Sequence, residues 1–490
     1  MQEKKWRWID HFGINAYWLG INIASGVITP LLLPYLVLLF MPEEQKNTYL
    51  ANVRVIGLAV AMLVQPLAGM LSDRNTSKFG RRRPFIFVGT IGNIIFLSLI
   101  GMTPLLMNSS SQGVFQTSTG FTTAYIGLLI GIVLLQISSN ISHGALQGVI
   151  PDLVPDNQRG RSSGVKAVLE LLPVFLVLFI GPLVDKGLVG LVVAIIAAGF
   201  LVTMVITLLS AKETPLTEKL TESIREPFLR LVALTAIFVG VTRIALWLVS
   251  ASGNFLGARG TSVELQVALV GLAGLIAMAG SIFIGVYFGA WVGIGKEARS
   301  QTSFIWWVVN RLMFLAAVGS IQGFAQYFLR DVLQIPNAAT MTTVLLAVVA
   351  LFLMPSAIFG GNLADRLGKK KLVRYAGLIA ATGTLILLFS RNMPMVILSG
   401  CVIGLGTGTF MASNWALGTD LVPKAQAGKY LGISNLAGAG AGIVGAGIGG
   451  PMADFFNKLQ PGLGYLVIFA IYGLLFLISA VTLVKVKVER

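Results

Sequence analysis

The sequence predicts an all-helical protein that crosses a membrane many times. Of its 490 residues, 55% are hydrophobic and only 11% are charged, whereas an ordinary globular protein is roughly 45 to 50% apolar and about 25% charged. The mean hydropathy is +0.83. A soluble domain needs a polar surface around its core, so this composition excludes a water-soluble fold.

Fourteen segments are long and apolar enough to span a membrane, for which roughly 20 residues are needed to cross about 30 Å of hydrocarbon. They lie near 12–40, 50–72, 84–106, 122–150, 165–185, 187–210, 230–253, 264–294, 302–329, 340–362, 372–390, 394–419, 430–454 and 463–484. An even number of spans places both termini on the same side of the membrane.

Basic residues report the orientation of these spans. The chain has 36 Lys and Arg against 20 Asp and Glu, a net charge of +16. When both termini are placed in the cytoplasm, most of the basic residues fall in inner loops and tails, as the positive-inside rule requires. The charge excess therefore predicts topology in a cell membrane, in contact with lipid, and not a nucleic-acid partner.

Three short motifs occur twice, in the same order in each half of the chain. Gly69-x-x-x-Asp73-Arg74 with Gly80-Arg81-Arg82 recurs as Gly361-x-x-x-Asp365-Arg366 with Gly368-Lys369-Lys370, residues 152–155 recur as 420–423, and residues 181–185 recur as 450–454. Such duplication is typical of transporters. It predicts a six-helix half at 1–210, a linker at 211–229, two extra central helices at 230–301 and a second six-helix half at 302–490.

The duplicated loop places charges of both signs at a helix end. Asp73 lies at the end of the second span, and Arg74, Arg81 and Arg82 follow it within ten residues. A compact ion cluster there can hold one membrane face of a two-half bundle shut. The alternative is a simple positive-inside anchor, but an anchor needs neither the glycine nor the aspartate that recur in both halves.

The stretch from Gly69 to Pro84 resembles the signature loop of the major facilitator superfamily. The first half also resembles the glycoside-pentoside-hexuronide carriers and sucrose transporters, through Pro66-x-x-Gly69, residues 73–84, 140–152 and Gln158-Arg159. This resemblance implies the major facilitator fold, transport by alternating access, and a sugar or glycoside as the solute. It also implies that the loop motifs gate access and do not bind solute.

The family's coupling residues do not carry over. Ala61 and Gln65 stand where melibiose-type carriers have the carboxylates that bind sodium, and Gln136 and Gln147 stand where plant sucrose transporters have an acid and an arginine. Coupling must therefore be sought among this chain's own charged residues.

Ionisable side chains within spans are costly and hence candidates for function. Glu170 is the one acid that lies away from the ends of a predicted span, which suits proton coupling, although Lys166 four residues earlier offers an ordinary helix ion pair. Arg311 is expected to face the cavity between the halves, where it binds an anionic group of a substrate, pairs with Glu170, or forms a structural ion pair between helices. Arg54 is expected to reach the lipid headgroups, and Arg243 to have a packing or lipid role.

Neutral polar residues suit a solute rich in hydroxyl groups. The cavity candidates, together with Arg311, are Gln136, Asn140, Gln147, Asn310, Gln322 and Gln326. Trp306, Trp307, Phe324 and Tyr327 offer rings that stack on a sugar, or else pack between helices. His143 is expected to be a packing residue, and the glycines of residues 438–450 to allow close helix contact.

The sequence thus predicts a secondary transporter of a sugar-like solute, with proton symport through Glu170. Antiport of drugs or organic ions is the main alternative, favoured by the two extra helices, and a transporter-like solute sensor is a further one. We expect no enzyme, no cofactor and no metal, because the single cysteine and two histidines are too few for a metal site and no catalytic motif is present.

Overall fold

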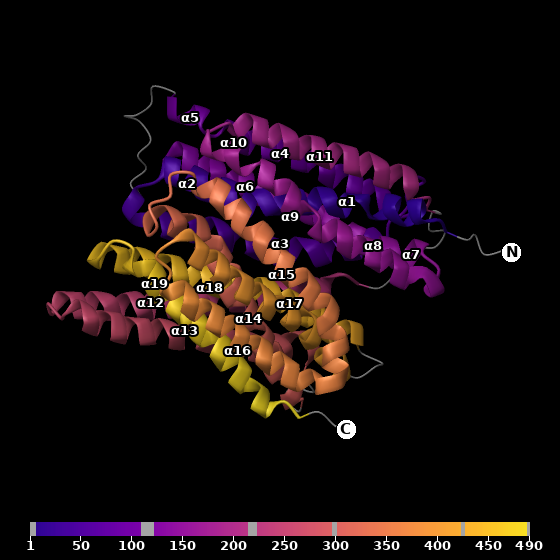
Figure 1. Ribbon diagram of the computed structural model, residues 1–490. Helices are drawn as coiled ribbons and strands as arrows, with labels where there is room; N and C mark the ends of the chain where they lie inside the picture. Colours follow the sequence, from indigo (N-terminus) through magenta and orange to yellow (C-terminus); the bar gives the residue numbers. More distant parts are fainter. Residues whose placement is uncertain (1–5, 109–121, 214–222, 296–300, 423–426, 488–490) are drawn as a thin grey trace. The chain divides into compact units, whose positions relative to one another are not determined.

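The chain folds into long helices. The computed structural model describes residues 6–108, 122–213, 223–295, 301–422 and 427–487, and no β-strand occurs in these ranges. They contain 13 helical segments that are long and apolar enough to cross a membrane. A further helix, α18 (Ala427–Leu459), occupies the position of the thirteenth predicted span. The all-helical, polytopic class predicted from the sequence is confirmed (Figure 1).

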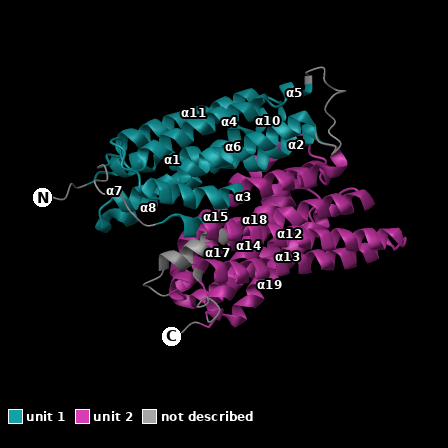
Figure 2. Ribbon diagram, turned by 180° about the vertical axis from the view of Figure 1, so that it is seen from behind, with its two compact units in different colours: residues 1–41, 60–228 teal, residues 42–59, 229–490 magenta. Residues whose placement is uncertain are grey.

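Two compact units divide the chain (Figure 2). Unit 1 comprises residues 1–41 and 60–228, and unit 2 comprises residues 42–59 and 229–490. The division passes through α3 (Lys46–Asp73), so the first part of this helix packs within unit 2 and the second part within unit 1. With 28 residues, α3 is about 42 Å long, which is long enough to cross a membrane.

Unit 1 contains broken as well as continuous spans. Its helices are α1 (Trp8–Val27), α2 (Leu33–Phe40), α4 (Arg83–Met102), α5 (Leu105–Asn108), α6 (Thr123–Leu146), α7 (Val149–Leu153), α8 (Arg159–Leu171), α9 (Pro173–Leu176), α10 (Gly181–Asp185) and α11 (Val189–Ser210). The fifth span is split into α8, α9 and α10, with Pro173 and Pro182 at the breaks, because proline lacks the N–H that continues a helix.

A buried polar network joins the helices of unit 1. Thr90 in α4 donates a hydrogen bond of 2.6 Å to the hydroxyl of Tyr17 in α1, and that hydroxyl lies 3.2 Å from the Ser142 hydroxyl in α6. Ser138 of α6 donates to the side-chain oxygen of Asn93 at 2.7 Å. Polar groups away from water need such partners, so the network fixes how α1, α4 and α6 pack.

Unit 2 holds the later helices, including the two that have no counterpart in the repeat. They are α12 (Arg225–Ala258), α13 (Val263–Ile294), α14 (Thr302–Asp331), α15 (Ala338–Leu367), α16 (Lys369–Leu388), α17 (Met393–Asp420), α18 and α19 (Leu463–Thr482). The two extra helices pack on each other and on α18. Phe238 of α12 lies against Gly285 of α13 and against Gly440 of α18. Residues 214–222 of the predicted linker fall outside the described ranges.

The glycines of α18 form the surface on which the first part of α3 lies. A Cβ atom on Gly442 would lie 2.6 Å from Leu58, one on Gly450 would lie 2.5 Å from Ala51, and one on Gly447 would lie 3.1 Å from Val55. Larger residues would push the two helices apart. The close helix contact that the sequence predicts for this segment is thus made with α3.

Candidate functional site

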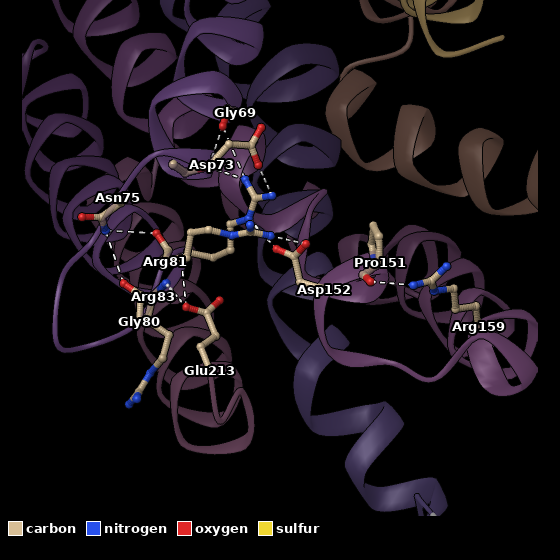
Figure 3. Close-up of polar contacts among 12 residues, drawn as sticks. Gly69, Asp73, Asn75, Gly80, Arg81, Arg83, Pro151, Asp152, Arg159 and Glu213 are labelled. Carbon is tan, nitrogen blue, oxygen red and sulfur yellow. Dashed lines mark hydrogen bonds and ion pairs between the residues drawn. The ribbon is translucent and has the colours of Figure 1, made fainter. Parts of the chain in front are cut away.

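Arg82 is the centre of an ion cluster in unit 1, near the end of α3. Figure 3 shows three other members of this cluster, Asp73, Arg81 and Asp152. The Arg82 guanidinium donates to Asp152 of α7 at 2.9 Å, to the Ser72 hydroxyl at 2.5 Å, and forms an ion pair with Asp73. Arg82 is only 5% exposed. A buried charge needs such partners, so the structure brings together the predicted residues Asp73 and Arg82 and adds Asp152 to them.

Arg81 contributes a second ion pair to this cluster. Its guanidinium contacts Asp152 directly. Burial acts to lower the pKa of Arg81, but its hydrogen bond to Asp152 and the charges of Asp152, Asp73 and Glu213 outweigh that effect and raise the pKa. The cluster is therefore held together by mutually stabilised charges, and Arg81 stays protonated throughout the physiological range. Arg74 lies half-buried at the end of α3.

Glu213 completes the cluster and was not predicted from the sequence. Its carboxylate accepts the backbone N–H of Arg82 at 2.8 Å and that of Arg83 at 3.4 Å, which caps the start of α4. Gly80 has φ +106°, and a Cβ there would overlap Glu213. The sequence shows only that an acid follows the sixth predicted span. It gives no indication that this acid contacts a loop 130 residues earlier.

The second copy of the loop, in unit 2, repeats part of this geometry. Lys369, which aligns with Arg81, lies 2.7 Å from Asp420, which aligns with Asp152. Gly368 has φ +92°, as Gly80 has a positive φ. Asp365 and Arg366 are exposed, and neither makes an ion pair with any described residue. A Cβ atom on Gly361 would have no neighbour within 4 Å, so Gly361 is not a close-contact glycine.

A second ion cluster lies in unit 2 at the other end of α3. Lys46 is 3% exposed and lies 2.6 Å from the carboxylate of Asp331, which also accepts the hydroxyl of Tyr465 at 2.5 Å. Glu43 lies 3.3 Å from Lys46 and 2.7 Å from Arg330. This cluster was not predicted from the sequence, because its members lie in three separate loops and helix ends.

Asp454 holds the start of α3 by hydrogen bonds alone. It is 4% exposed and accepts the backbone N–H groups of Asn47 at 3.2 Å and Thr48 at 2.7 Å. The side chains of the same residues donate to it at 2.8 and 2.6 Å. A carboxylate is stabilised at a helix N-terminus by free N–H groups and the helix dipole. Asp454 therefore fixes α3 to α18.

Arg54 does not extend to the lipid headgroups, so that expectation is wrong. Its guanidinium donates to the carbonyl oxygen of Gly319 in α14 at 3.0 Å. It rests on Gly323, where a Cβ would overlap it. Gly323 thus provides the space that the Arg54 guanidinium needs, and Arg54 makes a contact inside unit 2 instead of reaching the headgroups.

Arg311 lies on α14 as well, in a chain of hydrogen bonds. It donates to the side-chain oxygen of Asn414 in α17 at 3.2 Å, and its guanidinium lies 5.2 Å from the ring centroid of Trp415. Asn414 donates to Asn310 at 2.9 Å, and Asn310 donates to the backbone of Ser479 at 2.7 Å. Asn310 is fully buried, so it orients Asn414 and does not face a solute directly.

The other predicted cavity residues in unit 2 divide into accessible and buried ones. Gln322 of α14 is exposed, whereas Gln326 is buried. Trp307, Phe324 and Tyr327 are almost completely buried, and the Trp307 ring nitrogen donates to the backbone of Asn414 at 3.0 Å. These rings pack between helices and do not stack on a solute. Trp306 packs against Phe283, with ring centroids 5.3 Å apart.

In unit 1 the polar candidates of α6 are partly satisfied by each other. Asn140 is 5% exposed and donates to the backbone and side-chain oxygens of Gln136 at 2.7 and 3.0 Å. Gln147 is exposed at the end of α6. His143 packs edge-on against Trp18, with ring centroids 5.1 Å apart, in line with the packing role predicted for it.

Glu170 forms the ion pair that the simpler interpretation predicts. Its carboxylate lies 3.3 Å from Lys166, and the two side chains are 33% and 30% exposed. The Lys166 ammonium also lies 4.1 Å from the ring centroid of Trp18. Glu170 is thus a partly accessible acid with a cationic neighbour, and its coupling role stays a prediction.

Two family models match the chain. Residues 37–221 match the model described as "Sugar (and other) transporter", and residues 307–490 match the one described as "Major Facilitator Superfamily". Together they cover most of both units and leave out the two extra helices.

Curated relatives match shorter stretches. The minor myo-inositol transporter IolF of Bacillus subtilis is 31% identical over 88 residues, 18% of this chain and 20% of that protein. Proton-associated sugar transporter A of Mus musculus is 34% identical over 121 residues, 24% of this chain and 15% of that protein. Quinolone resistance protein NorA of Staphylococcus aureus is 30% identical over 115 residues, 24% of this chain and 30% of that protein. The matches span less than a third of each relative's length.

Solved structures match nearly the whole chain. A POT family transporter superposes with a TM-score of 0.64 at 14% identity, over 96% of this chain and 94% of that one. A D-xylose-proton symporter superposes with a TM-score of 0.60 at 14% identity, over 97% of each chain. At this identity the likeness establishes the fold. The named families and proteins are transporters and not enzymes, as the sequence leads us to expect.

Proposed function

Because the chain belongs to the major facilitator superfamily, we propose that it is a secondary transporter that moves a sugar or glycoside across the cell membrane by alternating access. The observation that carries this proposal is the presence of ion clusters at both ends of α3. One end is fixed by Asp454 in unit 2, and the other is followed by the Arg82 cluster of unit 1. In this proposal each cluster acts as a gate at one end of α3.

The clusters suit gating because their bonds are many but separable. In the proposed cycle Arg82 leaves Asp73 and Asp152 when its cluster opens, and Lys46 leaves Asp331 when the other end opens. Hydrogen bonds to charged groups contribute about 1.5 to 3 kcal/mol each. A few of them outweigh thermal energy yet can be exchanged for water, as a cycle between two states demands.

A sugar as the solute is supported by the sugar-transporter model over residues 37–221 and by the inositol and sugar transporters among the relatives. Neutral polar side chains at Gln136 and Gln322 suit hydroxyl groups. The six-two-six helix layout and the cytoplasmic position of both termini belong to the same proposal. They are tested by locating tags at each terminus with a membrane-impermeant protease.

Proton symport through Glu170 is the coupling we propose, supported by the proton-linked sugar transporters among the relatives and neighbours. The test is uptake of labelled glucose, xylose and myo-inositol into proteoliposomes, with and without an inward proton gradient. Glu170→Gln should abolish accumulation driven by the gradient but preserve equilibrium exchange. Glu264→Gln, which changes an acid at the start of α13, is the matched control. Unchanged accumulation in Glu170→Gln would remove that residue from coupling.

Antiport of a drug or organic ion is the second candidate, and the similarity to quinolone resistance protein NorA favours it. The same vesicles distinguish the two. If a proton gradient drives a lipophilic cation across the membrane while none of the three sugars is taken up, the antiport interpretation replaces the sugar one.

A further inference from the structure

We propose that α12 presents a docking face for a transmembrane helix of another protein, and that this helix carries an aspartate or glutamate at its middle, which pairs with Arg243. The inference concerns an interaction surface and does not depend on which solute is transported. It follows from an exposed arginine near the middle of a long apolar helix that has no counterpart in the duplicated halves.

Arg243 lies deep within the apolar stretch of α12. Arg230 and Arg259 mark the two ends of this stretch, and Arg243 is the only charged residue between them. Thirteen residues separate it from Arg230 and sixteen from Arg259, which correspond to about 20 and 24 Å along the helix. The hydrocarbon extends about 15 Å to either side of the middle of a membrane, and the three methylene groups of an arginine do not span that distance.

The guanidinium of Arg243 has no anion within this chain. The side chain is exposed and makes no hydrogen bond or ion pair with any residue that the structure describes. The neighbouring helix α13 (Figure 1) has no charged residue between Glu264 and Lys296. An arginine carries its charge permanently, and a charge in contact with lipid chains is costly. A carboxylate supplied by another molecule would remove this cost.

The exposed side of α12 lies opposite the side that packs on its neighbours. Buried residues at helical spacing form the packing side: Phe238, Thr242, Ala245, Val249 and Gly253. On the other side, a Cβ atom on Gly240 would meet nothing within 4 Å, and the Trp247 side chain is 67% exposed. Both residues lie one turn from Arg243. Gly240 therefore lets a second helix approach the backbone closely, and Trp247 adds apolar surface beside the charge.

A second copy of this chain does not supply the missing carboxylate. Every Asp and Glu except Glu170 lies at or beyond the end of a predicted span, and Glu170 is paired with Lys166 at 3.3 Å. Two copies joined through this face would also bring their Arg243 side chains together, and like charges repel strongly at low dielectric. The occupant that fits the face is therefore a helix of a different membrane protein.

The pairing of an arginine with a carboxylate gives this face its specificity. A guanidinium and a carboxylate form two parallel hydrogen bonds, and their attraction is stronger in lipid than in water. An uncharged amide at the same place on the partner helix would leave the buried cation without compensation. A partner with a central acid is thus expected to be preferred over an otherwise identical one with a central amide.

The experiment compares two synthetic helices of roughly 20 leucine and alanine residues, with aspartate at the centre of one and asparagine at the centre of the other. Energy transfer from the purified full-length protein to a dye on the helix measures binding in phosphatidylcholine vesicles. The donor dye is attached to Leu265→Cys, at the exposed start of α13, in a chain that also carries Cys401→Ala. We expect the aspartate helix to bind about tenfold more tightly than the asparagine helix.

Three variants assign this preference to the face. Arg243→Gln should remove it. Arg259→Gln, which changes an arginine at the end of α12 that lies 4.1 Å from the ring centroid of Phe255, is the control and should keep it. Gly240→Leu places a side chain in open space, so the protein's own packing is retained, but the approach of a second helix is blocked. The aspartate helix should then bind more weakly although Arg243 is still present.

Several outcomes would overturn the inference. Equal binding of the two helices, binding of neither, or the same loss in Arg243→Gln and Arg259→Gln would each do so. Self-association of the protein that Gly240→Leu abolishes would show that a second copy occupies the face. Loss of the preference when phosphatidylglycerol is added to the vesicles would show that a lipid phosphate pairs with Arg243 in place of a helix.

Discussion

Replacing Asp454 by asparagine should release the start of α3 from α18. The replacement amide keeps one oxygen, which can still accept from Asn47. It loses the second acceptor, which receives the N–H and the hydroxyl of Thr48 at 2.7 and 2.6 Å. Hydrogen bonds to a charged group contribute about 1.5 to 3 kcal/mol each, so we expect closure at this end of α3 to be weakened by about 3 kcal/mol.

This loss can be measured as accessibility. Val55 of α3 faces Gly447 of α18 and is 5% exposed, so a Val55→Cys substitution places a smaller, buried thiol between the two helices. The native thiol, Cys401, is removed by Cys401→Ala. Because every 1.4 kcal/mol corresponds to a tenfold change, Asp454→Asn should increase the rate of thiol labelling by about a hundredfold.

Asp185→Asn is the matched control. Asp185 occupies the equivalent position of the first repeat and is exposed at the end of α10, so its replacement should leave the labelling rate unchanged. If Asp454→Asn lowers the melting temperature but does not increase labelling, Asp454 stabilises the fold without closing this end, and the gating argument fails. Equal labelling in both variants would have the same consequence.

Three further predictions concern the Arg82 cluster and its counterpart. Arg82→Gln leaves two carboxylates without their shared cation and should lower the free energy of unfolding by about 3 to 5 kcal/mol. Arg83→Gln is the control and should change it little, because Arg83 contacts the cluster only through its backbone N–H. Similar melting curves for the two variants would contradict this prediction. Glu213→Gln should cost about 1 kcal/mol by weakening the cap of α4, seen as faster proteolysis near residue 82, while Glu226→Gln serves as a control. Gly80→Ala should destabilise the protein more than Gly368→Ala, because both glycines have positive φ but only Gly80 lies against a side chain, that of Glu213. At Gly368 the strained backbone alone should cost about 1 to 3 kcal/mol. The reverse order of melting temperatures would refute the role of Glu213.

Hydropathy and repeated motifs were sufficient for the helical class because they depend on local sequence. Arg81, Asp152 and their counterparts Lys369 and Asp420 all lie in the duplicated motifs. Their spacing in the sequence did not predict that the motifs contact each other as ion pairs. Arg54 shows where this approach ends. An arginine one turn inside a predicted span can either extend to the headgroups or bind a neighbouring helix. Here the choice depends on α14, where the Gly319 carbonyl oxygen accepts from Arg54 and Gly323 leaves room for it.

The remaining cluster residues were missed for the same reason. Glu213 and Asp454 bind backbone N–H groups at the starts of distant helices, and no residue pattern encodes such a contact. Trp307 and Tyr327 are residue types that can stack on a sugar, but both are buried. Trp307 lies against Gly418 of α17, and the Lys46 ammonium lies over the ring of Tyr327. Tertiary packing, not residue type, decided which polar and aromatic groups stayed accessible.

The division of α3 between two units restricts how this protein can change shape. The two parts of α3 belong to one continuous helix, although each part packs within a different unit. The helix contains Pro66, seven residues past the boundary at residue 59, and a proline removes one backbone hydrogen bond and permits a bend there. A bend at Pro66 is thus the change of shape that the sequence of α3 itself allows.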